Sequence, residues 1–527
     1  MPHMKKYIFG SLVTLLLSTF SPSLALAKDY FVSNTGSDTA AGTLAAPFKT
    51  IDRGILLALP GDIVYVRAGT YPAFNVNKSG TSTALITVSG YNNEYPKIVG
   101  GGPTIKTYQR SYVVINGFEV TGSTSGGGIR ADQSSYITIS NNKVHDNFGV
   151  SLNGIQLLRT ANSKVLNNIV YNNTSSGITN YGIEAINNEI AYNTVYNHTL
   201  STGNSDGIGC NGEAINLNIH HNTVYGNSDD GIDTWSCTHN TIAYNIVHNN
   251  GGTGDGNGIK SGGLPLGGYN LVTHNISYNN YSDGITGNGS GGNKFINNVT
   301  YGNAHDGIGD GWRNNFIDTT SYINNISFNN ARYDVSMSSG YVGVSHNNLW
   351  GKATWNYNGT MTLAQFYTAS GFDNPSAGSL SSITGDPMFV NPASADFHLQ
   401  SISKACTAGE NGSYLGVYPC STIVVPSPTP SPVIDATVPV VTITSPKTDA
   451  TVKRSTKVTI SATATDNVGI TKLEYYVNNS LKCSSTTVKS CSWSVPSSRG
   501  VTYTILVKAY DKAGNMGSSL ITVKSGR

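Results

Sequence analysis

Short strand-like hydrophobic runs fill the middle of the chain, and polar steps containing asparagine separate them. From about Ile86 to Asn348 these steps recur, counted on the second residue, at intervals of 26, 25, 29, 23, 30, 23 and 27 residues. A variable period of this size without a helical pattern predicts a right-handed parallel β-helix, since leucine-rich repeats and propeller blades carry other marks. The steps are Asn141-Asn142, Asn167-Asn168, Tyr192-Asn193, His221-Asn222, Tyr244-Asn245, His274-Asn275, Asn297-Asn298 and Asn324-Asn325.

Asparagine at a repeated corner has a structural explanation. It tolerates a left-handed backbone, and its amide can hydrogen-bond to an equivalent amide on the next turn of the coil. We therefore interpret these residues as formers of the coil rather than as functional groups.

A second repeated step, Gly-Ile, keeps pace with the first. It occurs at Gly182, Gly207, Gly231, Gly258, Gly284 and Gly307, at intervals of 25, 24, 27, 26 and 23 residues. If each step occupies the same place on its turn, the residues that follow it, Gly209, Asp233 and Lys260, stand in vertical succession on strands ~4.8 Å apart.

The two ends of the repeat region have different patterns. A helix is predicted from about Thr50 to Leu59, with Ile51, Ile55 and Leu59 on one apolar face, and it would cover the open end of the solenoid. Beyond the repeats, the segments 385–391 and 396–399 are typical of the closing turns of such a coil.

A proline-rich stretch, Val424 to Pro432, marks a boundary, and alternating strands from Pro439 to Val523 predict an immunoglobulin-like sandwich. The predicted fold is therefore all-β. It has a signal peptide over 1–27, a parallel β-helix catalytic domain over 28–420, a linker over 421–437 and an Ig-like module over 438–527.

The first residues have the features of a secretory signal peptide. Lys5 and Lys6 precede a mostly apolar run from Tyr7 to Phe20, and Ala25-Leu26-Ala27 is a small-residue cleavage site. We expect a secreted, extracellular protein. The apolar run is too short to span a bilayer, and no later stretch approaches ~20 apolar residues, so a membrane protein is not expected.

Charge is sparse and unevenly distributed. Charged residues make up 12% of the chain, and the formal net charge is +2. From Val438 onward there are 12 Lys and Arg against 4 acidic residues, whereas residues 28–437 hold 18 against 26. A basic terminal module suits a polyanionic matrix as partner, although an ordinary solubilising surface has the same composition.

The cysteines fall into three pairs of neighbours along the sequence, which in an exported chain indicates three possible disulfides. Buried free thiols remain the alternative, because spacing does not determine connectivity. The pairs are Cys210 with Cys237, Cys406 with Cys420, and Cys483 with Cys491.

One lysine stands among many carboxylates. Lys260 is the only Lys or Arg between Lys164 and Lys294. The stacked Gly-Ile steps bring it next to an acidic cluster whose members would repel one another unless a cation joined them. The cluster consists of Asp206, Asp229, Asp230 and Asp233.

Hard oxygen ligands without His or Cys favour Ca²⁺ over Zn²⁺, with Mg²⁺ and Mn²⁺ left open. The alternative is that an Asp before Gly-Ile merely forms the corner, as at Asp283 and Asp306. This alternative accounts for Asp206 and Asp230 and leaves Asp229 and Asp233 unexplained.

Lys260 has two interpretations. It can form a salt bridge to Asp230 or Asp233, or it can act as a base. With Ca²⁺ on those carboxylates the pKa of the ammonium should fall, and neutral amine would be available at alkaline pH. A neutral lysine beside a metal that binds a substrate carboxylate is suited to remove the adjacent carbon-bound proton, after which the β oxygen is eliminated.

Two motifs carry a family resemblance. The sequences Asp-Asp-Gly-Ile-Asp-Thr-Trp at 229–235 and Gly-Asn-Gly-Ile-Lys-Ser-Gly-Gly at 256–263 closely resemble those of the polysaccharide lyase family 9 pectate lyases. The general pattern of the resemblance covers residues 29 to 420, and the Ig-like module lies outside it.

The resemblance implies that Asp206, Asp229, Asp230 and Asp233 bind Ca²⁺ and that Lys260 is the Brønsted base in the β-elimination of polygalacturonate. The expected partner is polygalacturonate or a related anionic uronic-acid polysaccharide, bound by a monomer, with neither nucleic acid nor membrane involved.

Three alternatives remain open. A polygalacturonase-type glycoside hydrolase shares the β-helix and uses Asp clusters, but it gives Lys260 no role. A lyase of another uronic-acid polymer would use the same residues. A non-catalytic carbohydrate-binding adhesin would account for the proline-rich stretch and the basic module.

Overall fold

The computed structural model divides the chain into two compact units, Met1–Thr422 and Ile423–Arg527. The predicted signal peptide before residue 27 and the predicted linker lie outside the described residues. These residues are 27–149, 152–199, 204–263, 267–309, 320–337, 343–355, 359–370, 382–420, 439–467, 469–485, 490–511 and 516–526.

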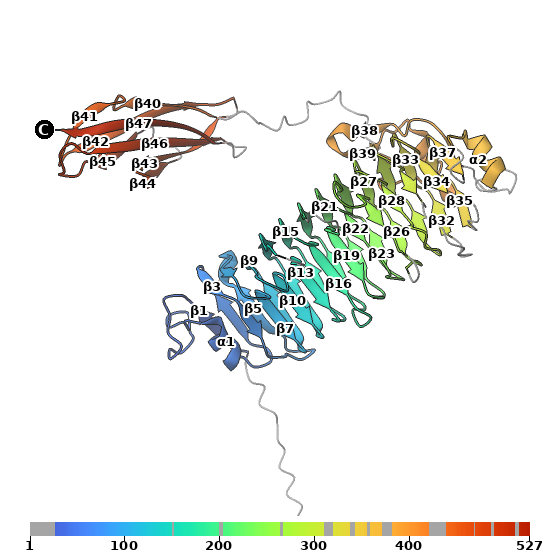
Figure 1. Cartoon of the computed structure of the whole chain (residues 1–527), viewed down its shortest axis with the longest axis horizontal. Coiled ribbons are helices and arrows are strands. Elements are labelled where there is room, and N and C mark those ends of the chain that lie inside the picture. The colour runs from blue at the N-terminus through green and yellow to red at the C-terminus, as the bar shows by residue number, and fades with distance from the viewer. Residues whose placement is uncertain are drawn as a thin grey trace, which may run out of the picture. The chain divides into compact units, whose positions relative to one another are not determined.

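The first unit is a right-handed parallel β-helix in which three sheets run along the coil (Figure 1). Each turn contributes one short strand to each sheet, and every strand pairs in parallel with its counterpart on the next turn. We call these sheets I, II and III.

The described strands of sheet I are β1 (Asp29–Val32), β2 (Ile63–Val66), β5 (Ile86–Gly90), β8 (Ser111–Asn116), β11 (Ser135–Ser140), β14 (Lys164–Leu166), β17 (Glu189–Ala191), β20 (Asn218–His220), β23 (Thr241–Ala243), β26 (Leu271–Thr273), β29 (Lys294–Ile296), β32 (Thr320–Ile323) and β35 (Gly343–His346). Those of sheet II are β4 (Phe74–Val76), β7 (Ile105–Tyr108), β10 (Ile129–Asp132), β13 (Ile155–Leu158), β16 (Ile178–Tyr181), β19 (Ile208–Asn211), β22 (Ile232–Asp233), β25 (Ile259–Lys260), β28 (Ile285–Thr286), β31 (Ile308–Gly309), β34 (Val335–Met337) and β37 (Ala353–Trp355). Those of sheet III are β3 (Thr70–Pro72), β6 (Lys97–Val99), β9 (Glu119–Thr121), β12 (Lys143–His145), β15 (Ile169–Tyr171), β18 (Thr194–Tyr196), β21 (Thr223–Tyr225), β24 (Ile246–His248), β27 (Ile276–Tyr278), β30 (Val299–Tyr301), β33 (Ile326–Phe328) and β36 (Leu349–Trp350).

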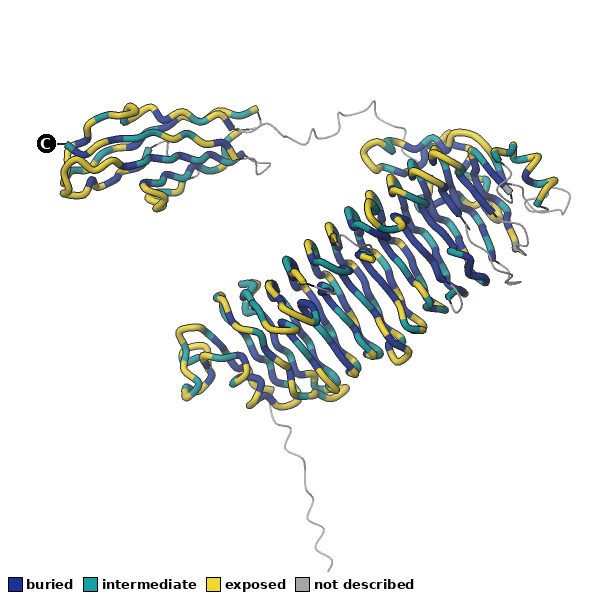
Figure 2. Tube along the Cα trace, in the orientation of Figure 1, coloured by how far each residue is buried: buried dark blue, intermediate teal, exposed yellow. Residues whose placement is uncertain are grey.

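Stacked aliphatic side chains fill the inside of the coil. At one position of sheet II the isoleucines of the Gly-Ile steps from Gly207 onward lie directly above one another, as with Ile208, Ile232 and Ile259, all fully buried. The predicted place of the step at Gly182 in this series was wrong, because Ile183 is 62% exposed and Ile178 occupies the position on that turn. Figure 2 shows buried positions alternating with more exposed ones along the strands. Since side chains on a strand point alternately to its two faces, the residue after each isoleucine faces outward.

The two residues of each asparagine step have different structural roles. The amide hydrogen bonds and the left-handed backbone that the pattern predicted are both present. The second residue of each step is buried and joins a ladder along the coil. Asn222, for example, donates from its backbone N–H and from Nδ2 to Asn245 Oδ1, both at 3.0 Å, and accepts the same pair of bonds from Asn193. This ladder satisfies backbone groups that the corner would otherwise bury without partners. Its members are Asn142, Asn168, Asn193, Asn222, Asn245, Asn275, Asn298, Asn325 and Asn348.

The first residue of each step has a left-handed backbone, with φ of 55° at Asn141 and 60° at Tyr192. At four consecutive turns this residue is aromatic or histidine instead of asparagine. Tyr192, His221, Tyr244 and His274 stack on one another, with ring centroids 4.8 to 5.1 Å apart. Ring stacking between turns accompanies the left-handed geometry there.

The predicted amino-terminal helix is present but shorter than expected. Helix α1 spans Ile51–Leu57, and the Thr50 side chain caps it by accepting from the Arg53 N–H. Ile51 and Ile55 are buried, whereas Leu59 is 59% exposed, so its predicted place on the apolar face was wrong. Leu59 precedes Pro60, which keeps it out of the helical region and ends the helix early.

The segments expected to be closing turns form a different structure. Strands β38 (Phe389–Asn391) and β39 (Asp396–Leu399) pair antiparallel across the 3₁₀ turn η3 (Pro392–Ser394). Phe389 and Phe397 pack against Ile276 and Val299 of sheet III instead of adding a turn to the coil. Near the last rungs, helix α2 (Leu363–Ser370) places Phe366 in the core of the β-helix. Further 3₁₀ turns among the described residues are η1 (Tyr91–Asn93), η4 (Lys404–Cys406) and η5 (Glu410–Gly412).

The second unit is a two-layer β structure, as the alternating strands predicted. Tyr475, Trp493 and Ile505 are central to its core. One layer contains β40 (Val440–Ser445), β42 (Lys457–Thr465) and β45 (Ser490–Ser494), and the other contains β41 (Ala450–Lys453), β47 (Met516–Gly526), β46 (Thr502–Asp511), β43 (Ile470–Val477) and β44 (Ser480–Ser485).

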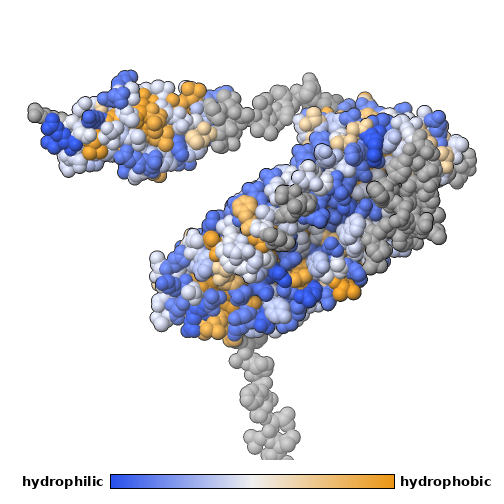
Figure 3. Space-filling model, viewed as in Figure 1, coloured by the Kyte–Doolittle hydropathy of each residue, from blue (hydrophilic) through white to orange (hydrophobic). Residues whose placement is uncertain are grey.

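The three predicted disulfides form, between Cys210 and Cys237, Cys406 and Cys420, and Cys483 and Cys491. No helix among the described residues is long and apolar enough to cross a membrane. Figure 3 shows that the visible face of the β-helix carries mostly hydrophilic residues, with hydrophobic ones in small groups.

The asparagine ladder provides a stability test. Asn222→Ala removes the acceptor of both bonds from Asn193 and the Nδ2 donor to Asn245, which leaves buried donors without acceptors, so we expect the free energy of unfolding to fall by about 3 kcal/mol. Denaturant unfolding measures this change. The matched control is Asn218→Ala on the exposed side of β20, which should change stability by less than about 0.5 kcal/mol. Equal stabilities of the two variants would contradict the role of the ladder.

Candidate active site

The candidate site lies on the outer face of sheet II. The register pairs Gly209 of β19 with Asp233 of β22, and Asp233 with Lys260 of β25. The vertical succession of Gly209, Asp233 and Lys260 expected from the Gly-Ile steps is therefore confirmed, and it places the lysine on the turn directly after that of Asp233.

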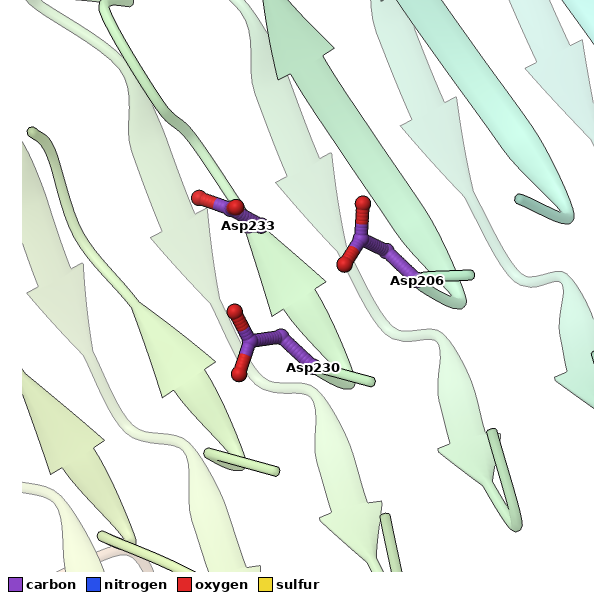
Figure 4. Close-up of side chains that lie close together, drawn as sticks. All are labelled: Asp206, Asp230 and Asp233. Atoms are coloured by element: carbon purple, nitrogen blue, oxygen red, sulfur yellow. The ribbon is translucent and has the colours of Figure 1, made fainter. Parts of the chain in front are cut away.

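Three of the four predicted carboxylates converge. Asp206 and Asp230 come from the turns just before β19 and β22, and Asp233 ends β22. One carboxylate oxygen from each lies within 4.8 Å of the others. In Figure 4 the three carboxylates surround one small space.

Asp229 lies beside this group, but its oxygens are engaged elsewhere. Its Oδ2 accepts the backbone N–H of Asn204 at 2.8 Å, and its Oδ1 accepts that of Asp255 at 2.6 Å. Both contacts join neighbouring turns, so in this structure Asp229 clamps the loops around the cluster. The structure thus brings Asp206, Asp230 and Asp233 together and gives Asp229 a different set of partners.

The carboxylate group retains unused acceptor capacity. Asp206 Oδ1 and Asp233 Oδ1 are buried and have no hydrogen-bond partner among the described residues. A buried carboxylate oxygen without a donor is costly. Oxygens from three carboxylates form a donor set that a hard divalent cation such as Ca²⁺ prefers. The residues therefore fit a Ca²⁺ ion.

Burial sets the protonation of the cluster. Burial, followed by repulsion from Asp233 and Asp230, raises the pKa of Asp206 well above its usual value. Burial raises the pKa of Asp233 to about 8 and that of Asp230 to about 6, although the charge of Lys260 opposes both shifts. Without a cation, the group cannot ionise fully at neutral pH.

Lys260 is held by carboxylates on three sides. Its side chain is 9% exposed, and Nζ lies 2.7 Å from Asp255, 3.2 Å from Asp230 and 3.5 Å from Asp233. Burial disfavours the ammonium, but attraction to Asp233 and Asp230 and the hydrogen bond with Asp255 outweigh it and raise the Lys260 pKa. In this arrangement the lysine is charged.

Sequence reasoning did not assign two of the neighbouring residues to the site. Asp255 contacts Lys260, and Asn257 donates from its backbone N–H and from Nδ2 to Asp230 Oδ1. Asn257 precedes a Gly-Ile step, the position that Asp206 and Asp230 occupy on their turns, so the alignment of the repeats could have found it. Asp255 sits five residues before Lys260 in the preceding loop, for which the repeat gave no signal.

The cluster opens into a groove of about 500 Å³ on sheet II. Trp235 is 38% exposed and forms one wall, with Lys260 Nζ 5.2 Å from its ring centroid. Gly263 allows this placement, because a Cβ there would lie 2.4 Å from the indole ring. Tyr181, 49% exposed, lines the groove on the amino-terminal side. Exposed aromatic rings beside charged groups suit a polar ligand with apolar faces.

The Cys210–Cys237 disulfide braces the same place. Cys210 belongs to β19 and lines the groove, and Cys237 lies in the turn after β22. The bond ties together the two rungs that carry Asp206 and Asp233. It restricts the movement of carboxylates that repel one another.

Comparisons with known proteins agree with this geometry. Residues 30–315 match the family described as "Pel9A-like, right handed beta helix region", and residues 439–507 match "Bacterial Ig domain". Pectate lyase PEL9 of Emericella nidulans is 27% identical over 310 residues, which cover 51% of this chain and 71% of that protein. The uncharacterized protein YwoF of Bacillus subtilis is 26% identical over 215 residues, covering 39% of this chain and 43% of that protein.

A solved structure shares the fold. The crystal structure of pectate lyase Pel9A superposes with a TM-score of 0.50 at 18% identity, over 76% of this chain and 98% of that chain. The family match covers the candidate site, the strands that carry it and α1. The chain belongs to the Pel9A-like right-handed β-helix family and carries a bacterial Ig domain after its β-helix.

Proposed function

We propose that this chain is a secreted, Ca²⁺-dependent polysaccharide lyase that cleaves polygalacturonate by β-elimination, with Lys260 as the base. The observation that carries the proposal is the juxtaposition of the buried Asp230, the partly buried Asp206 and Asp233, whose Oδ1 atoms have no donor, and one buried lysine. A pectate lyase relative and membership of the Pel9A-like family support it. The charged and apolar pattern of residues 5–27 supports secretion.

Asp206, Asp230 and Asp233 would hold the Ca²⁺ ion. When bound, the ion neutralises these carboxylates, attracts a carboxylate of the substrate and stabilises negative charge that develops beside it. Asp206 and Asp233, which carry the donor-free oxygens, line the groove in which a substrate would lie.

The role of Lys260 follows from its surroundings. Attraction to Asp230 and Asp233 now keeps the ammonium protonated. If their charge is neutralised, the ammonium loses its attraction to Asp230 and Asp233, and burial then opposes only the remaining contact with Asp255, so the lysine pKa falls. The neutral amine then accepts the proton on the carbon next to the substrate carboxylate. The electron pair left on that carbon forms the new double bond, and the glycosidic oxygen at the β position departs.

The structure disfavours the hydrolase alternative. Glycoside hydrolysis uses two carboxyl groups placed on either side of the scissile bond, about 5 to 9.5 Å apart. Here one carboxylate oxygen from each of Asp206, Asp230 and Asp233 lies within 4.8 Å of the others, so the three groups converge on one point. Asp229 has both oxygens engaged by backbone amides.

The base role makes a direct prediction. Lys260→Ala should lower kcat on polygalacturonate about a thousandfold, because removal of a positioned base costs on that order. Ultraviolet absorbance of the unsaturated product, measured at alkaline pH with Ca²⁺ and with chelator, follows the reaction. Chelator should abolish the signal of the wild-type chain.

The control for this assay is Lys164→Ala, which removes a lysine on β14 whose partner is Glu189 at 2.7 Å. It should retain wild-type activity. A Lys260→Ala enzyme that keeps its rate would refute the assigned chemistry. A wild-type chain that releases no ultraviolet-absorbing product from any uronic-acid polymer would refute the lyase proposal as a whole.

The cluster also predicts how Ca²⁺ affinity depends on pH. The metal-free pKa values of about 6 for Asp230 and about 8 for Asp233 mean that protons occupy the site at lower pH and that Ca²⁺ must displace them. Affinity should therefore rise as the pH rises from 6 to 8. Titration calorimetry in buffers of different ionisation enthalpy should detect the released protons.

Asp233→Asn removes one ligand charge and should weaken Ca²⁺ binding at every pH in this range. Asp52→Asn on α1 removes an acidic charge outside the groove and should leave binding unchanged. If affinity does not change with pH and no proton is released, Ca²⁺ binds elsewhere on the chain.

A further inference from the structure

One outward-facing row of sheet II continues far beyond the candidate site. Strand register places Asp233, Gly209, Thr179 and Gln156 above one another on successive turns. The next residue toward the amino terminus is Arg130, paired with Gln156, and Lys106 follows it. Figure 1 shows their strands, β7, β10, β13, β16, β19 and β22, in succession along the coil.

The groove follows this row. Its lining runs from Lys260 and Asp233 past Gly209 and Thr179 to Gln156. Because Gly209 and Thr179 have small side chains, the groove stays open between the carboxylates and the amino-terminal turns of the coil. Trp235 and Tyr181 also line the groove. The turn of the coil that contains β19, with Asn211 paired to Tyr181, lies between them. An extended chain of sugar rings therefore has a continuous path along the axis of the coil.

Positively charged side chains lie at the amino-terminal end of this path. Among the described residues of β7, β10 and β13, Asp132 is the only carboxylate. It pairs with Arg130 at 2.9 Å and with Arg159 at 3.5 Å. One carboxylate cannot neutralise two guanidinium groups, and Lys106 adds a further positive charge beside Arg130. Arg130 Nε is buried and has no hydrogen-bond partner among the described residues.

In the other direction along sheet II, the described residues of the turns beyond Lys260 include Asp283 and Asp306, and Arg332 is paired with Asp306 through two hydrogen bonds of 2.7 and 2.8 Å. A polyanionic chain is therefore attracted toward the amino-terminal rungs rather than toward these turns.

We propose that Arg130, assisted by Lys106, forms a distal subsite that binds the carboxylate of a uronic-acid unit remote from the cleaved bond. Arg130 lies four rungs from Asp233, about 19 Å along the coil at ~4.8 Å per rung. Guanidinium groups bind carboxylates through paired hydrogen bonds. The inference rests on the proposed function, because it takes an acidic polysaccharide as the substrate, and it adds the direction in which the chain extends.

The subsite predicts a dependence on substrate length. In the full chain carrying Lys260→Ala, which prevents turnover, Arg130→Ala should weaken binding of a long oligogalacturonate about tenfold, the loss of one charge-assisted contact. Binding of trigalacturonate, which is too short to reach from Asp233 to Arg130, should not change. Titration calorimetry with Ca²⁺ present measures both affinities. The tenfold effect should shrink at high salt.

Two further variants test the interpretation. Lys97→Ala removes a cation that pairs with Glu119 at 2.7 Å on sheet III, and it should bind both oligomers as the parent does. Arg130→Lys keeps the charge but cannot form the paired hydrogen bonds, so its affinity for the long oligomer should lie between those of the parent and Arg130→Ala. If Arg130→Lys, folded like the parent, binds the long oligomer more weakly than Arg130→Ala, the residue does not bind a carboxylate and the subsite is wrong.

Failure of the inference and failure of the proposed function give different results. If the Lys260→Ala chain binds the long oligogalacturonate and Arg130→Ala binds it equally well, the distal subsite is wrong and the lyase proposal stands. If Arg130→Ala weakens both oligomers to the same extent, the residue acts on the whole groove and the distal assignment is wrong. If the Lys260→Ala chain binds no uronic-acid polymer, the proposed substrate is wrong and the subsite falls with it.

Discussion

The in-register stacking of parallel turns is the constraint on which the rest of this protein depends. Because every strand of sheet II sits directly above its counterpart, one residue per turn contributes to a straight outward-facing row. The buried asparagine ladder and the stacked isoleucines resist slippage, since a shift by one residue would exchange inward and outward side chains. Carboxylates from separate turns can therefore be held close together despite their repulsion.

This rigid stacking holds carboxylates that repel one another close together at the site. Asp206, Asp230 and Asp233 have lost water to burial and raise one another's pKa, and Lys260 offsets only part of the accumulated charge. The fold holds this arrangement with contacts that lie elsewhere, including the Cys210–Cys237 disulfide and the amide clamps on Asp229. In the proposed function a divalent cation would neutralise these carboxylates, and its binding would change the protonation of the lysine.

Much of the architecture could be predicted because its signals are local and repeated. The Gly-Ile and asparagine steps predict the coil, the register of Asp233 with Lys260 and the left-handed corners. Predictions failed where the repeat gives no information. Leu59 leaves the helix because a proline follows it, and the hairpin around Phe389 and Phe397 packs outside the coil because sheet III exposes apolar residues there.

The sequence by itself determined the solenoid, the Ig-like module and the residues that form the acidic cluster with Lys260, because periodicity carries residue positions from one turn to the next. Only the tertiary structure decided how each group is used. It showed that the backbone N–H groups of Asn204 and Asp255 donate hydrogen bonds to the Asp229 carboxylate. It also showed that the Asp255 side chain binds Lys260. Loops between strands differ in length from turn to turn. The contacts of residues in these loops, such as Asp255, therefore depend on how each loop folds against its neighbours and not on the period of the coil.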